Sequence, residues 1–259
     1  GGMTCGRLEA QLTLSSAVDL TLTITAIGGP YTVTIAAASY FPTTLLSTIQ
    51  TQLDAASGAD GAFTVSMSKT DGTGTGLVTI AHATQTFTLD IPIPLRQFLG
   101  FAGNLTPAAL TFTGTTCLRG VWLPDCPFDS TYGNELGHTE LDRSTTITPT
   151  GAMTGLVYQS RRRHPEFRWA HVTRARAREA AETTTGQSFE AWFLDTHGGR
   201  YTTYYVTCPQ VKVYSDSTND TAIGSFYLNA PSVDTSMEKI AAPWHGLWSV
   251  AIGGYKVPT

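Results

Sequence analysis

A stretch of strict alternation near the start of the chain most constrains its fold. In residues 18–27 (VDLTLTITAI), apolar side chains alternate with threonines. A period of two is typical of a half-buried strand, because successive side chains point to opposite faces of a sheet. Residues 31–37 (YTVTIAA) alternate again after a Gly-Gly-Pro turn, so the sequence predicts a β-hairpin over 18–37.

The periodicity changes directly after this hairpin. Leucine and isoleucine in residues 42–57 recur three and four positions apart, the spacing of one helix face. Pro42 suits the first turn of a helix, and Gly58 suits its end. The sequence therefore predicts a helix over 42–57.

More strands and a short helix complete a first module. Strand patterns recur in 62–68, 77–82 and 86–91, with DGTGTG as the loop between the first two. Residues 93–101 predict a short helix that ends at Gly100. Together these elements predict an N-terminal β-rich module over residues 1–113.

Residues 114–150 differ in composition from what precedes them. They contain three prolines and few apolar runs, with Trp122 and Phe128 as expected anchors. Long connections of this kind are usually functional arms or linkers. We therefore expect a connector or arm over 114–150.

Strand patterns resume in residues 151–259, which predict a C-terminal β-rich module. Residues 156–163 and 166–177 predict a hairpin that turns near His164 and Pro165. A helix is expected at 187–196, where aromatic residues share one face. The further expected strands are 201–207, 210–215, 224–230 and 246–257.

The composition agrees with this reading and excludes several classes of protein. The 259 residues include 43 threonines, yet only 14% of them are charged and the net charge is −4. Plentiful apolar residues argue against disorder, and scarce Glu, Lys and Arg argue against a coiled coil. No apolar run reaches the roughly 18 residues of a membrane helix, and the first residues predict no signal peptide. The expected fold class is α+β, mainly β, with two sandwich-like or barrel-like modules and one flanking helix in each.

The arginines are unevenly distributed. Seven of the twelve lie within 161–178, whereas the other residues carry nine Lys and Arg against nineteen Asp and Glu. A basic block is typical of an acidic partner surface, an internal salt-bridge network or nucleic acid. No nucleic-acid-binding motif accompanies it, so a protein partner or an internal network is favoured, and a solvated strand face stays open.

The sequence contains no recognisable catalytic motif. The chain has no G-x-S-x-G, HExxH or phosphate-binding loop motif, so we expect no enzyme, cofactor or bound metal. Two polar groups resemble metal ligands only weakly: His164, Glu166 and His171, and Asp216, Asn219 and Asp220. Cys117 and Cys126 either bridge a loop or remain thiols.

The order of these elements resembles a family. The run YTVTIAAASYFPTTLLSTIQTQLDAA, followed by FTVSMS, GLVTIAH, TFTLD and LRQFLGF, is similar to a module of tailed-bacteriophage virion proteins. In this chain the module closes with Leu99-Gly100-Phe101. The segments EFRWAHVTRARAREA, SFEAWFLDTHGGRYTTYY and LWSVAIGGYKV resemble phage tail proteins of the distal-tail and tail-tip kind.

The resemblance implies a structural role in a virion. Such proteins form trimeric or hexameric rings around a channel through which DNA passes as cargo, in contact with other tail proteins and without a membrane. They are assembled in the host cytoplasm and reside in the phage tail, at the distal tail, the tip or baseplate, or the tube. The alternatives are a capsid-decorating or head–tail connector protein, or a receptor- or carbohydrate-binding β-module.

A ring with rotational symmetry needs two different patches on each subunit. We expect the arginine-rich segment 161–178 to form one patch and the connector to reach over a neighbour. The expected subunit-interface residues are Arg161, Arg162, Arg163, Arg168, Arg174, Arg176, Trp122 and Phe128.

Overall fold

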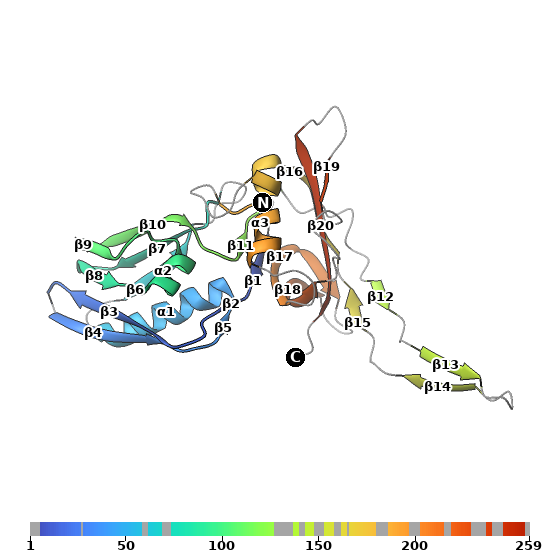
Figure 1. Ribbon diagram of the computed structural model, residues 1–259, viewed down its shortest axis with the longest axis horizontal. Helices are drawn as coiled ribbons and strands as arrows, with labels where there is room; N and C mark the ends of the chain where they lie inside the picture. Colours follow the sequence, from blue (N-terminus) through green and yellow to red (C-terminus); the bar gives the residue numbers. More distant parts are fainter. Residues whose placement is uncertain are drawn as a thin grey trace.

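The computed structural model has two β-rich lobes and a two-stranded arm (Figure 1). The N-terminal lobe holds the strands between residues 12 and 117. The C-terminal lobe holds the strands at 7–10 and 121–122 and those between residues 166 and 256. The arm consists of the strands between residues 137 and 164. The structure describes residues 6–26, 28–58, 62–68, 74–126, 137–139, 143–147, 153–157, 162–164, 166–179, 186–196, 203–214, 219–228, 237–239 and 246–256.

A four-stranded antiparallel sheet forms one layer of the N-terminal lobe. Its order is β4 (Gly28–Ile35), β3 (Val18–Ile24), β8 (Phe87–Asp90) and β9 (Leu105–Ala109). Buried and exposed residues alternate strictly along β3, with the threonines exposed. The predicted hairpin is confirmed, although its glycines belong to the start of β4 instead of the turn.

A three-stranded sheet forms the second layer. It runs from β10 (Thr111–Cys117) through β7 (Leu77–His82) to β6 (Phe63–Met67). The phenyl rings of Phe63, Phe87 and Phe112 meet edge to face across the two sheets, with centroids 5.0 and 5.2 Å apart. This geometry suits aromatic quadrupoles, so the two sheets share one core.

Two helices complete this lobe as expected. Helix α1 (Pro42–Ser57) starts with proline and is followed by Gly58, and it buries Leu45, Leu46, Ile49 and Leu53 against the sheets. Helix α2 (Ile93–Leu99) ends at Gly100, which has the left-handed conformation. A short pair of strands, β2 (Leu12–Thr13) and β5 (Ser39–Tyr40), lies at the entrance to α1.

The C-terminal lobe is built on one large sheet. Its order is β11 (Val121–Trp122), β1 (Arg7–Ala10), β17 (Thr203–Tyr214), β18 (Asn219–Leu228), β20 (Leu247–Lys256) and β16 (Glu166–Thr173). Strand β19 (Met237–Lys239) also pairs with β20. Two π-helical turns and one α-helical turn accompany the sheet: η1 (Ala175–Glu179), α3 (Phe189–Ala191) and η2 (Trp192–Thr196).

The arm is a β-ribbon. Strand β12 (Gly137–Thr139) pairs with β15 (Arg162–His164), and β13 (Arg143–Ile147) pairs with β14 (Met153–Val157). The two registers differ by one residue, so both pairs belong to one antiparallel hairpin. In Figure 1 the β13–β14 end of this ribbon projects away from both lobes.

Strand pairing overturns one expected hairpin. The predicted hairpin between 156–163 and 166–177 is wrong, because β15 pairs with β12 and β16 pairs with β20. Strand β15 lies beside β20 as well, so the chain runs on from β15 into β16 instead of turning back. A residue that precedes proline favours extended backbone, which suits continuation as well as a turn.

The expected module boundaries also change. Residues Arg7–Ala10 pair with β17 and therefore belong to the C-terminal sheet, not to a module spanning 1–113. Strand β10 extends beyond residue 113 to Cys117. The fold class itself, α+β with mainly β structure, is confirmed. Among the described residues, no helix is both long enough and apolar enough to cross a bilayer.

Candidate assembly surfaces

Of the expected interface residues, two are described by their backbone alone and two are not described. Arg162 and Arg163 lie in β15, at the end of the arm that joins the C-terminal lobe, opposite Thr139 and His138 of β12. Arg161 and Phe128 lie outside the described residues. The arginine block therefore enters the arm, a relation that the sequence did not predict.

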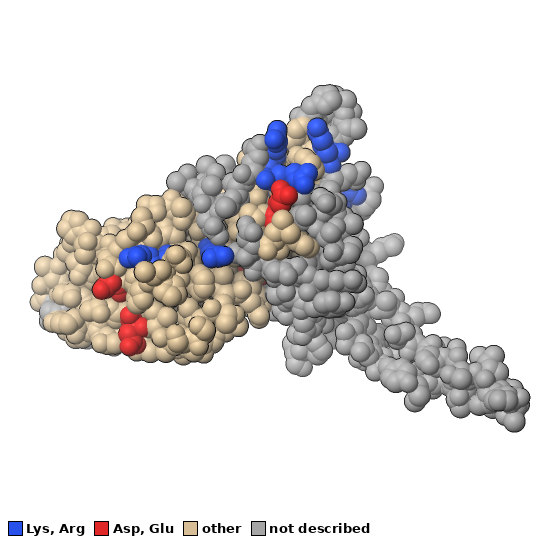
Figure 2. Space-filling model, in the orientation of Figure 1, with Lys and Arg blue, Asp and Glu red and all other residues tan. Residues whose placement is uncertain are grey.

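The other end of the arginine block lies on β16 and η1. Arg174 and Arg178 are exposed, and Figure 2 shows basic side chains gathered at this end of the C-terminal lobe. The Arg178 guanidinium lies 5.0 Å from the centre of the Trp248 ring and forms an ion pair of 3.3 Å with Glu190. This arrangement orients a cation at a surface, but surface ion pairs contribute little to stability.

Arg168 and Arg176 form bonds within the chain. The Arg168 Nε donates to Ser249 Oγ at 3.0 Å and links β16 to β20. The Arg176 Nη2 donates to the Gly74 carbonyl oxygen at 2.7 Å and reaches the N-terminal lobe. Burial lowers the pKa of Arg176, while Asp125 and Cys117 act in the opposite direction. Arg176 therefore belongs to the contact between lobes, and its expected place at a subunit interface stays a prediction.

Trp122 is also an internal residue. Its side chain is fully buried, and its indole Nε1 donates to the Arg176 carbonyl oxygen at 2.8 Å. The rings of Trp169 and Phe189 meet it edge to face, with centroids 4.9 and 5.2 Å away. A side chain enclosed in this way offers no surface to a neighbouring subunit, so Trp122 is removed from the expected interface.

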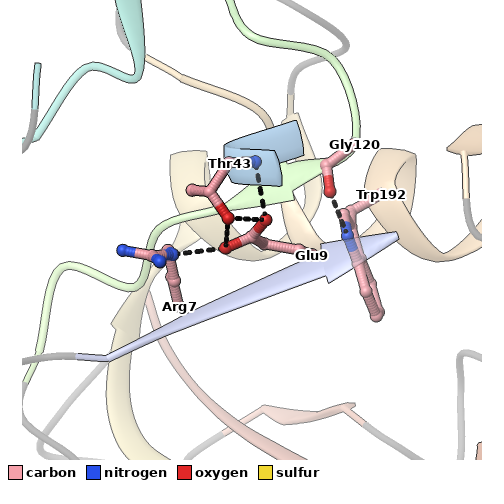
Figure 3. A network of polar contacts seen from close by, with 5 residues as sticks. All are labelled: Arg7, Glu9, Thr43, Gly120 and Trp192. Carbon is pink, nitrogen blue, oxygen red and sulfur yellow. Dashed lines mark hydrogen bonds and ion pairs between the residues drawn. The ribbon is translucent and has the colours of Figure 1, made fainter. Parts of the chain in front are cut away.

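A buried carboxylate joins the two lobes. Glu9, in β1 of the C-terminal sheet, accepts hydrogen bonds from the Thr43 amide at 3.0 Å and the Thr43 hydroxyl at 2.8 Å (Figure 3). Its second partner is Arg7, whose Nε lies 2.5 Å from Glu9 Oε1. The carboxylate thus satisfies an amide at the start of α1, where a negative charge is favourable. Nothing in the sequence pointed to this role.

Gly120 adds a second link at the same place. Its carbonyl oxygen accepts the Trp192 Nε1 at 2.9 Å and the Ala10 amide at 2.7 Å. Figure 3 shows the bond between Trp192 and Gly120 beside the hydrogen bonds of Glu9. The chain therefore crosses between the lobes twice, after β1 and before β11. Hydrogen bonds stabilise both crossings.

We predict that Glu9→Ala lowers the free energy of unfolding by about 2–4 kcal/mol, because it removes a buried charged acceptor from three donors. Chemical denaturation followed by tryptophan fluorescence measures the change. Asp19→Ala is the control: Asp19 is exposed and accepts one hydroxyl, so a change within about 1 kcal/mol is expected. Equal losses in the two variants would contradict the proposed role of Glu9.

No group of three or more His, Cys, Asp or Glu among the described residues is arranged to hold a metal ion. His171 is exposed, and the side chains of His164 and Glu166 are outside the described set. Cys117 and Cys126 are buried thiols, so the alternative of a disulfide between them is wrong.

In comparisons with known proteins, no family model, curated protein or solved structure matches this chain.

Proposed function

We propose that this chain is a structural subunit of a tailed-bacteriophage virion. It is a ring-forming tail protein that assembles around the DNA channel, and it lies at the distal tail, the tip or baseplate, or the tube. The proposal rests on the resemblance in element order and on one feature of the fold, the β-ribbon arm.

The arm is the observation that favours assembly. Strands β13 and β14 pair with each other and with no other described strand. An isolated two-stranded ribbon is at best marginally stable in water, because it has no core of its own. At about 3.3 Å per residue, the five residues of β13 alone span roughly 17 Å. A neighbouring subunit is the partner that such an extension suits.

The charge distribution is consistent with the same role. Basic side chains gather at one end of the C-terminal lobe, whereas the remainder of the chain is acidic overall. Contact between these two kinds of surface on successive copies joins different patches, as a closed ring demands. An acidic excess also suits a channel for DNA, since dense phosphate contacts would retard its passage.

Removal of the arm tests the proposal. A variant in which Asn-Gly replaces 143–157 retains both lobes and Trp122, unlike deletion of the whole connector. Light scattering over a range of concentrations is expected to show rings or tubes for the full chain and monomers for the variant. Near-UV circular dichroism of the buried tryptophans provides the control for folding.

Two outcomes would count against a ring-forming subunit. One is a full chain that remains monomeric at every concentration. The other is a shortened chain that assembles as readily as the full chain, with the same subunit number.

A further inference from the structure

The outer edges of the N-terminal sheets are protected to different degrees. On β6, the Phe63 amide donates to Asp54 Oδ1 at 2.6 Å, and the Val65 amide donates to Gln50 Oε1 at 3.0 Å. Both acceptors come from α1, so side chains of the helix take the place of a neighbouring strand. This edge cannot pair with another chain without losing these bonds.

The edges of β10 and β9 are blocked by other means. The Gly100 carbonyl oxygen, at the end of α2, accepts the Thr115 and Thr116 amides of β10 at 2.8 and 3.0 Å. Strand β9 contains Pro107, which has no amide hydrogen. A proline on an edge strand is a common protection against pairing with other chains.

Strand β4 forms the fourth edge, and its direction can be derived from the ladder. The Thr25 amide donates to the Thr86 carbonyl at 2.9 Å, on the β8 side of β3. Odd-numbered residues of β3 therefore bond to β8, and even-numbered ones bond to β4. Leu20 pairs with Val33 in β4, so the amides of Thr32 and Thr34, between such pairs, point away from the sheet.

The β4 edge is open within the described part of the chain. No described side chain or backbone group bonds the Thr32 or Thr34 amide. The strand, GGPYTVTI, carries no charge, but Pro30 has no amide hydrogen, so the open stretch is limited to the five residues from Tyr31 to Ile35. In this stretch Tyr31, Val33 and Ile35 direct their amides toward β3, and all three are aromatic or β-branched. The two residues whose amides point outward, Thr32 and Thr34, are threonines. An uncharged edge of high β-propensity is a template for strand addition.

We infer that the open edge of β4 receives the β13–β14 ribbon of a second copy of this chain. The β4 strand and the ribbon each have an edge that no described strand occupies, and joining them gives the ribbon a sheet. In Figure 1 the arm projects from the side of the molecule opposite to β4, so one copy cannot satisfy its own edge.

The chemistry of the two elements is compatible. The ten residues of β13 and β14 carry a single charge, on Arg143, and β4 carries none. The ribbon and the β4 edge lie at opposite ends of the molecule. The contact between two copies is therefore head to tail and propagates to a closed ring or a filament. This inference rests on the proposed function and names the strands through which the subunits join.

The test replaces one outward amide without changing the inner ladder. Thr32→Pro removes the amide hydrogen that points away from β3, and an edge strand tolerates proline at such a position. Thr32→Ala is the matched control, since it keeps the amide and removes the same side chain. Light scattering is expected to show that Thr32→Pro raises the concentration for half-assembly by about tenfold or more relative to Thr32→Ala.

Hydrogen exchange identifies the strand that occupies the edge. In the assembled full chain, the Thr32 and Thr34 amides are expected to exchange at least about tenfold more slowly than in the variant lacking 143–157. Thermal unfolding of each variant checks that the N-terminal lobe remains folded.

The possible results separate this inference from the proposed function. Assembly of the full chain with fast exchange at Thr32 and Thr34 overturns the pairing and leaves the ring-forming role standing. Slow exchange that persists without the arm assigns the edge to another segment and also overturns it. A chain that never assembles overturns both.

Discussion

Replacement of Trp122 by alanine is expected to lower the free energy of unfolding by about 3–5 kcal/mol, the range for large aromatic side chains removed from a core. The loss combines a cavity between Trp169 and Phe189 with an unsatisfied carbonyl oxygen at Arg176. Because β11 is the second crossing between the lobes, we expect the whole C-terminal sheet to lose stability. Denaturation followed by far-UV circular dichroism measures the effect.

Two further variants separate the causes of this loss. Trp122→Phe keeps most of the apolar volume and removes the indole donor, so a smaller loss of about 1–3 kcal/mol is expected. Leu110→Ala is the surface control, because Leu110 is 47% exposed, and a change within about 0.5 kcal/mol is expected. If Trp122→Ala were as mild as Leu110→Ala, the packing around Trp122 described above would be incorrect.

Substitution of Gly100 by alanine is expected to cost about 3–5 kcal/mol, from backbone strain and overpacking together. Gly100 has a φ of 75°, and an added Cβ lies 2.1 Å from the Thr116 carbonyl oxygen and 2.8 Å from its carbon. These are backbone atoms, so relief requires α2 to move away from β10. Thermal and chemical unfolding of the variant measure this cost.

Gly58 provides the matched control for Gly100. It also follows a helix and has a positive φ of 66°, but an added Cβ meets nothing within 4 Å. Gly58→Ala is therefore expected to cost only the backbone strain, about 1–3 kcal/mol. Equal losses at the two glycines would show that the close approach of α2 to β10 contributes no energy.

Local patterns in the sequence were sufficient to predict most elements of the N-terminal lobe. Residues 42–57 carried the helical period, a proline start and a glycine stop, and the helix has those bounds. Residues 77–82 showed the strand period, and β7 has the same bounds. Side-chain periodicity reports which face of an element is buried, and this property depends only on neighbours along the chain.

The same patterns could not predict which strands pair with each other. Residues 7–10 form a strand because β17 and β11 lie on either side, and the four residues show no pattern of their own. The same holds for β12 and β15, whose pairing replaced the expected hairpin between 156–163 and 166–177. Alternation predicts a strand but is silent about the strand beside it, since every backbone carries the same donors and acceptors.

The candidate assembly residues show the same difference between what the sequence predicts and what only the folded chain decides. The sequence identified a cluster of arginines and two aromatic anchors, because their positions can be read directly from it. Only the folded chain distinguishes Trp122 and Arg176, which fasten the lobes together, from Arg174 and Arg178, which are exposed. A buried indole and an exposed one look alike in a sequence. Their difference is made by residues distant along the chain, which close around one side chain and leave another in water.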